Sequence, residues 1–175
     1  MNEIIKKNGV SFGVITGVVG ALITTLIYSI DLKLFTAWWV TVISISSYIV
    51  IAIVLLSKTK KELKGIFSFK DAFTTYFISA VIGILISVAF NIILFNFIDP
   101  SAKEAIKEIS IKYAVEMMEK FGTPSSAINE AVKKLQENDQ FSILELLKSS
   151  VFSIAFSALF GLLLALIFKS KPSQE

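Results

Sequence analysis

Lys148, Ser149 and Ser150 come nearest to a catalytic arrangement, because a lysine can serve as the base for a serine nucleophile. Neighbouring residues on a helix point in different directions, so the spacing is geometrically poor for such a pair. The chain has no Cys and no His, which removes thiolate chemistry and the usual general base at neutral pH. All 17 basic residues are lysines, so bidentate guanidinium binding is excluded too. We therefore expect that the protein is not an enzyme and has no catalytic residue.

Acidic residues at helical spacing, Glu104 with Glu108 and Glu116 with Glu119, could supply oxygen ligands to a divalent cation. Lysines are interleaved with these carboxylates, however, and such charges usually form a solvated helix face. The sequence also has no glycine-rich phosphate loop, no Gly-x-Ser-x-Gly and no His-Glu-x-x-His. We expect no metal site, no cofactor and no cofactor-binding residue.

The apolar residues make up 54% of the chain, against about 45–50% in a soluble domain, and they are concentrated in four uncharged blocks. Roughly 20 helical residues cross a hydrocarbon core of about 30 Å, and each block is long enough. Ser68 and Asp71 fit a capping box, which starts the third span near Phe69. The sequence thus predicts a single all-α integral membrane domain over residues 1–175, a four-helix bundle with spans at about 9–30, 34–57, 69–98 and 149–168.

Lysines are unequally distributed over the polar segments. Residues 1–8, 58–71 and 169–175 hold nine lysines and four acids, whereas residues 31–33 and 99–148 hold eight lysines and ten acids. The positive-inside rule places short lysine-rich segments in the cytoplasm. We therefore expect both termini in the cytoplasm. The formal charge of +3 then reflects orientation in the membrane, and we expect no nucleic-acid partner.

In this orientation, segment 99–148 is extracytoplasmic, and its pattern predicts an amphipathic helical hairpin between the third and fourth spans. Asp99 and Pro100 would cap and begin a helix, and Gly122–Pro124 would separate it from a second one. The apolar residues expected to share one covered face are Ala102, Ile106, Ile109, Tyr113, Met117, Phe121, Ile128, Ala131, Val132 and Leu135. The expected ion pairs on the polar side are Glu108–Lys112, Glu116–Lys120 and Glu130–Lys134.

Small residues recur at every fourth position in three of the spans. In membranes such stripes let helix backbones approach closely, so we expect them to pack against neighbouring helices; lining a pore is the alternative. Asn91 and Asn96 are the polar residues nearest the middle and the outer end of the third span; Asn91 could contact a substrate, but we favour a hydrogen bond between helices. The stripes are Gly9, Gly13, Gly17 and Ala21; Thr75, Ser79, Gly83 and Ser87; and Ser149, Ser153, Ser157, Gly161 and Ala165.

With these features in place, the chain resembles an uncharacterised bacterial membrane family, domain-of-unknown-function family 4199. The resemblance rests on the glycine-spaced first span, on Phe69–Phe73 at the start of the third and on Ile98-Asp99-Pro100 at its end. It implies a four-span, multi-pass protein of the bacterial cytoplasmic (inner) membrane. It implies no activity and no site residues.

The sequence does not specify a biochemical activity. We expect a non-enzymatic membrane protein that acts through protein or lipid contacts, as an accessory or assembly factor, with the lipid bilayer and a protein partner or a second copy as its contacts. The alternative is a small-solute or lipid transporter or channel without an ionisable residue in its spans. A polar cluster facing one cavity between spans would favour transport. A dry bundle with an apolar groove outside the membrane would favour the accessory role.

Overall fold

The computed structural model describes residues 1–170. Within that range the regular structure is helical, without a β-strand, which confirms the all-α prediction. The predicted cytoplasmic segment 169–175 lies outside the described residues from position 171 onward. The α-helices are α1 (Glu3–Ile30), α2 (Trp38–Glu62), α3 (Phe69–Ile93), α4 (Pro100–Lys120), α5 (Ser125–Glu137) and α6 (Ile143–Phe168); a 3-10 helix, η1 (Leu32–Thr36), precedes α2, and a π-helical turn, η2 (Leu94–Ile98), continues α3.

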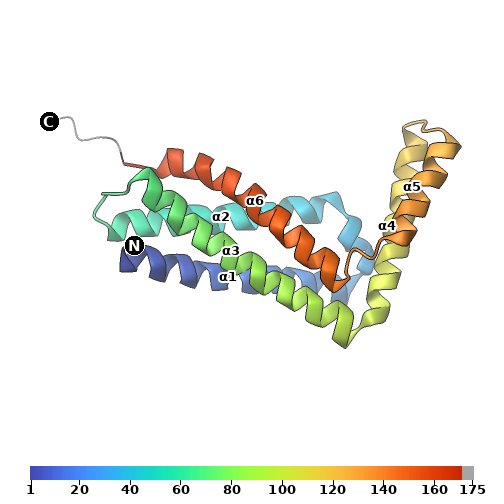
Figure 1. The fold of residues 1–175 in the computed structure, drawn as a ribbon, viewed down its shortest axis with the longest axis horizontal. Helices are drawn as coiled ribbons and strands as arrows, with labels where there is room; N and C mark the ends of the chain where they lie inside the picture. Colours follow the sequence, from blue (N-terminus) through green and yellow to red (C-terminus); the bar gives the residue numbers. More distant parts are fainter. Residues whose placement is uncertain (171–175) are drawn as a thin grey trace.

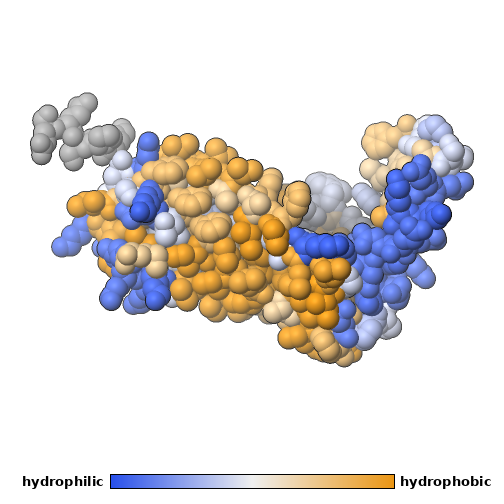
Figure 2. All heavy atoms as spheres, in the orientation of Figure 1, coloured by the Kyte–Doolittle hydropathy of each residue, from blue (hydrophilic) through white to orange (hydrophobic). Residues whose placement is uncertain are grey.

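Helices α1, α2, α3 and α6 are each long and apolar enough to cross a membrane, as predicted. They run side by side, and the α4–α5 hairpin projects from one end of them (Figure 1). Hydrophobic residues form a band over the long helices, with hydrophilic residues at both ends (Figure 2). The N-terminus and the end of α6 lie at the end opposite the hairpin. We call that end the lysine-rich end and the other the hairpin end.

The helix boundaries follow local chemistry. Ser68 caps α3 by accepting a hydrogen bond from the Asp71 amide at 3.1 Å, and its own hydroxyl donates to the Asp71 carboxylate, so the predicted start at Phe69 is confirmed. Asp99 caps α4 by accepting from the Ser101 and Ala102 amides, with Pro100 in the first turn, again as predicted. The hydrogen bond from the Ser101 hydroxyl, and then the one from Tyr28, lower the pKa of the Asp99 carboxyl.

Four helix boundaries differ from the predicted span boundaries: α1 begins at Glu3, α2 begins at Trp38 and ends at Glu62, and α6 begins at Ile143. Helix α2 begins at Trp38 and not at Leu34, because the three residues between the predicted spans are too few to reverse the chain, and Leu32–Thr36 form the connecting 3-10 turn instead. Asp31 caps this turn by accepting from the Lys33 amide at 2.9 Å. Helix α6 begins at Ile143, capped by Ser142, so the helix of the fourth span starts within the segment assigned to the hairpin, 99–148.

The closest helix pair is α1 with α3, and it uses the first small-residue stripe as predicted. Each glycine faces one isoleucine: a Cβ added at Gly9, Gly13 or Gly17 would come within 2.9, 2.7 or 2.5 Å of Ile78, Ile82 or Ile86 respectively. Both series advance by four residues in the same direction, so the two helices are parallel. The missing side chains therefore let α1 and α3 approach closely over about two turns.

Contacts at the lysine-rich end join all four long helices. Ala52, Leu56, Ala72, Leu164 and Ala165 form a buried cluster with Phe67, which comes from the α2–α3 connection and is fully buried. The Asn8 side-chain amide of α1 donates to Thr59 at 3.2 Å and to Glu62 at 2.8 Å, both on α2. The Ser170 amide donates to the Phe67 carbonyl at 2.7 Å. The helices are consequently held together at this end.

An aromatic cluster holds the hairpin end. The rings of Phe95 and Phe141 are 4.3 Å apart, and Phe35 of η1 lies edge-on to both. Ala102 and Ile106 of α4 are buried in the same cluster. The Tyr28 hydroxyl of α1 donates to Asp99 at 2.8 Å, which ties the first span to the start of the hairpin.

The hairpin is helical, as predicted, but its apolar face is only partly covered. Ala102 and Ile106 are buried against the bundle, whereas Phe121 at the tip is 80% exposed. Of the predicted surface ion pairs, Glu130–Lys134 forms at 2.7 Å. The ion pairs within residues 1–170 include neither Glu108–Lys112 nor Glu116–Lys120, so those two predictions are wrong; long exposed side chains gain little from such pairing.

The base of the hairpin is held by polar contacts with α4. Lys103 pairs with Asp139 at 2.8 Å, and the Lys107 ammonium donates to the Gln136 carbonyl at 2.5 Å. Partial burial raises the pKa of the Asp139 carboxyl. The hydrogen bonds from Lys103 and the Phe141 amide, together with the charges of Lys103 and Lys107, lower this pKa by more than burial raises it, so the net shift is downward. Asp139 is thus a carboxylate that the folded hairpin stabilises.

Candidate intramembrane binding site

The small-residue stripe of α6 divides into two halves. Gly161 and Ala165, toward the lysine-rich end, are buried, and a Cβ at Gly161 would lie 2.6 Å from the Tyr76 ring of α3. Ser149 and Ser153, toward the hairpin end, are exposed. Close packing is therefore confirmed only for the first half. In the second half the serines line a cavity between the spans.

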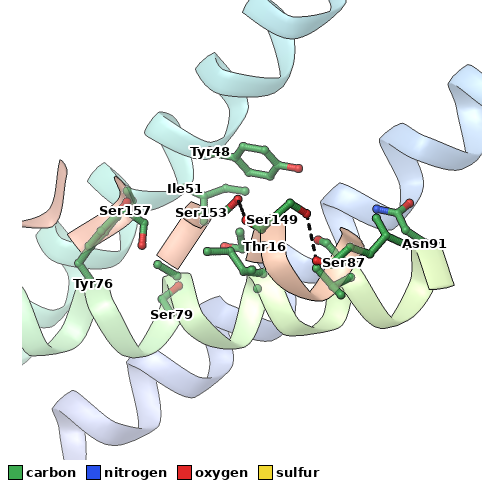
Figure 3. Close-up of a pocket in the computed structure, with 16 residues that line it drawn as sticks. Thr16, Tyr48, Ile51, Tyr76, Ser79, Ser87, Asn91, Ser149, Ser153 and Ser157 are labelled. Atoms are coloured by element: carbon green, nitrogen blue, oxygen red, sulfur yellow. Dashed lines mark hydrogen bonds between the residues drawn. The ribbon is translucent and has the colours of Figure 1, made fainter. Parts of the chain in front are cut away.

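This cavity, the inner pocket, has a volume of about 380 Å³ and is bounded by all four long helices. In Figure 3 Asn91 lies at one end of it, Tyr76 and Ser157 lie at the other, and the remaining hydroxyl groups lie between them. Along α3 it extends from Tyr76 to Asn91, roughly 22 Å of helix at 1.5 Å per residue. Its polar lining residues are Thr16, Tyr48, Tyr76, Ser79, Ser87, Asn91, Ser149, Ser153 and Ser157.

Four of these hydroxyls have already used their hydrogen within their own helix. Thr16 donates to the Phe12 carbonyl at 2.8 Å, Ser149 to Leu146 at 3.0 Å, Ser153 to Ser149 at 2.9 Å and Ser157 to Ile154 at 3.0 Å. Such back-bonding satisfies a hydroxyl in a helix without any partner from another helix. Each oxygen keeps acceptor capacity, so toward the pocket these four groups act as acceptors.

The other five polar side chains of the pocket (Tyr48, Tyr76, Ser79, Ser87 and Asn91) have no side-chain hydrogen bond to any described residue. No enclosed polar side-chain atom within residues 1–170 lacks a partner, so the polar atoms of these five are accessible from the pocket. The hydroxyls of Tyr48 and Ser87 both approach Gly20, where an added Cβ would lie 2.9 and 2.6 Å from them. The absence of a side chain at Gly20 therefore leaves room for both hydroxyls at this wall.

An outer groove of about 1110 Å³ adjoins the inner pocket, and Tyr48, Tyr76 and the three serines of α6 line both. Its other walls are mainly apolar: Ile45 and Ile49 from α2, and Phe152, Phe156 and Phe160 from α6. Phe152 and Phe156 are 82% and 72% exposed, so the groove opens sideways between α2 and α6. In a bilayer this opening faces lipid.

Charged groups of the site are confined to the hairpin end of the outer groove. Glu145 and Lys148 line it there and pair with each other at 2.6 Å. No Asp, Glu or Lys lines the inner pocket. Lys148 is thus held by Glu145, while the hydroxyls of Ser149 and Ser150 donate to carbonyls of α6, so the structure does not form a Ser–Lys dyad.

The two asparagines of the third span have different roles. Asn96 donates to the Phe141 carbonyl at 2.9 Å, a bond that joins η2 to the non-helical segment before α6. Asn91 lines the pocket without a side-chain hydrogen bond to the described chain, so the prediction for Asn91 is wrong. Residues 1–170 contain no group of His, Cys, Asp and Glu that could hold a metal ion, including the glutamates of the hairpin.

Tyr48, Tyr76 and Thr16 were not recognised as site residues from the sequence. The available signal was that the α6 stripe changes from glycine and alanine to serine at Ser157 and continues so to Ser149. A stripe of hydroxyl residues can line a polar cavity, whereas a stripe of glycine and alanine only allows close approach.

The four long apolar helices, with a partly polar cavity between them, are compatible with a multi-pass membrane protein. A family model described as "Protein of unknown function (DUF4199)" matches residues 11–170, and the chain belongs to that family. Comparisons with curated proteins and with solved structures gave no match.

Proposed function

We propose that the protein is a non-enzymatic membrane protein that binds an amphiphilic lipid in the cleft formed by the inner pocket and the outer groove. The observation that carries the proposal is the combination of a polar inner pocket with an apolar groove that opens sideways between α2 and α6. An unpartnered polar group in the hydrocarbon region costs several kcal/mol, so five such side chains favour an occupant with polar groups of its own. The exposed phenylalanines of the groove would contact the occupant's hydrocarbon chain.

Lipid transport is the second candidate, because the polar residues face one cavity between the spans. Transport would require the cleft to open at both ends. At the lysine-rich end, Leu56, Phe67 and Ala165 are fully buried in the cluster that joins α2, α3 and α6. The arrangement therefore favours entry from the side, between α2 and α6, over passage through the bundle. Coupling to ions is not favoured, since no carboxylate or lysine lines the inner pocket.

A matched pair of substitutions on α6 tests lipid binding. Ser153→Leu fills the cleft, whereas Val151→Leu enlarges a side chain that is 68% exposed on the same helix. The proteins would be purified in mild detergent from a bacterial membrane and their retained lipids measured by native mass spectrometry. We expect wild type and Val151→Leu to retain a lipid that Ser153→Leu loses. Identical lipid profiles for all three would contradict the proposal.

We further propose that both termini face the cytoplasm of a bacterium and that the α4–α5 hairpin is extracytoplasmic, on the basis of the lysine distribution. The thiol-free chain allows single cysteines to be labelled without background. Ile66 is 80% exposed and uncharged, which makes it a suitable labelling position at the lysine-rich end. A cysteine at Ser126 should react with an impermeant thiol reagent added to intact cells, and one at Ile66 only after lysis. The reverse pattern would invert the assignment.

A further inference from the structure

We propose that the inner pocket is selective for an uncharged head group that carries several hydroxyl groups, as in a glycerol or sugar ester of a fatty acid. This inference rests on the proposed lipid binding and specifies its ligand class. Three properties of the pocket lead to it: its lack of charge, its hydrogen-bonding capacity and its size.

The lack of charge disfavours phosphate-containing head groups. No lysine lines the inner pocket, and Lys148, at the hairpin end of the outer groove, is paired with Glu145 at 2.6 Å. A phosphate in the inner pocket would therefore be a charge removed from water without a counter-charge, which is strongly unfavourable. A neutral head group avoids that desolvation penalty.

The hydrogen-bonding groups of the pocket are complementary to a polyol. Thr16, Ser149, Ser153 and Ser157 have donated their hydrogens within their own helices and can only accept from a ligand. A ligand must therefore supply several donors, which an ester or an ionised phosphate lacks and a polyol has. The side chains of Tyr48, Tyr76, Ser79, Ser87 and Asn91 can both donate and accept, and hydroxyl groups of a ligand do the same.

The two volumes indicate how such a lipid would be divided between the pocket and the groove. The inner pocket, at about 380 Å³, lies at the small end of the range for ligand pockets, about 300–1,000 Å³. It has room for a small head group. The outer groove, at about 1110 Å³ and lined by Ile45, Phe152 and Phe156 among others, has room for a chain. The head group would then lie deeper in the protein than the chain.

The test compares monooleoylglycerol with lysophosphatidic acid of the same oleoyl chain, because the two differ only in the phosphate. Delipidated full-length protein in mild detergent would be titrated with each, and bound lipid counted by native mass spectrometry. We expect monooleoylglycerol to bind at least about tenfold more tightly than lysophosphatidic acid.

The double variant Ser149→Ala, Ser153→Ala should weaken the binding of monooleoylglycerol by about tenfold, since two hydrogen bonds are lost. The matched control is Ser47→Ala, which removes a back-bonded hydroxyl of α2 that does not line the cleft, and should not change affinity.

The outcomes separate the inference from the proposed function. If lysophosphatidic acid binds as tightly as monooleoylglycerol or more tightly, and Ser153→Leu abolishes the binding of both, the selectivity is overturned while lipid binding in the cleft stands. Binding of monooleoylglycerol that is unaffected by the double alanine variant also overturns it. If neither lipid binds and retained lipids do not respond to Ser153→Leu, the proposed function fails together with the inference.

Discussion

Replacing Gly17 with leucine introduces a side chain at the closest approach of α1 and α3. A Cβ at this position would lie 2.5 Å from the Cβ of Ile86 and 2.7 Å from its Cγ2. Non-bonded carbons pack at about 3.5–4.0 Å, so even alanine would require the helices to separate by about 1 Å. The contacted atoms of Ile86 are the branch point and a methyl group next to the backbone, which cannot rotate away as the end of a flexible chain could.

The expected loss of stability follows from two opposing effects. Inserting carbon atoms into a close-packed contact costs about 1–3 kcal/mol, whereas removing a glycine from a helix interior gains about 0.5–1 kcal/mol. Alanine at position 17 should therefore destabilise by about 1 kcal/mol. Leucine, with three more carbons, should cost roughly 2–3 kcal/mol or more. For a chain of this size, each kcal/mol lowers the thermal midpoint by about 2–4 °C, so we expect a decrease of roughly 5–10 °C for Gly17→Leu.

Val18→Leu is the matched control, because Val18 is adjacent and 47% exposed. A surface substitution of this kind changes stability by about 0.5 kcal/mol or less, or about 2 °C. The assay is thermal aggregation of the purified proteins in mild detergent, followed as the soluble fraction after heating. Equal shifts for Gly17→Leu and Val18→Leu would show that the glycine stripe does not face α3, and would refute the packing described for the two helices.

Two further predictions concern the α4–α5 hairpin. The pKa of Asp139 is lower in the folded protein than its ordinary value of 3.8, so its stabilising contribution should be complete above that value and lost as the pH falls through the lowered pKa. Acid should loosen the hairpin base in wild type, and Asp139→Asn should be loosened already at neutral pH, both measured by limited proteolysis with a protease active at the pH of each measurement; a wild-type cleavage rate that does not rise relative to Asp139→Asn in acid would contradict this. Hydrogen exchange should be slow around the buried Ile106 and fast at the exposed Phe121, and uniformly fast exchange over residues 101–137 would show that the segment does not fold.

Much of the architecture could be predicted from the sequence because it depends on local chemistry. Uncharged blocks long enough to cross a bilayer determine the spans, since a backbone in hydrocarbon must satisfy its hydrogen bonds within a helix. Ser68 and Asp99 identify the starts of α3 and α4, because each provides a side-chain acceptor beside unpaired amides. The glycine stripe of α1 also predicted a close helix contact, since only small residues let backbones approach.

The tertiary structure determined which helix each stripe packs against and which part of a stripe remains unpacked. The sequence shows Ser149, Ser153, Gly161 and Ala165 as one continuous stripe, yet only its glycine and alanine half is packed. Helix α6 is held close to α3 at both ends by contacts among residues distant in sequence, Gly161 with the Tyr76 ring and Phe141 with Phe95, and the cleft lies on its side toward α2. Such contacts depend on the angle between helices, which no local pattern specifies. The inner pocket is therefore a property of the helix arrangement, whereas the residue types that make it polar are already present in the sequence.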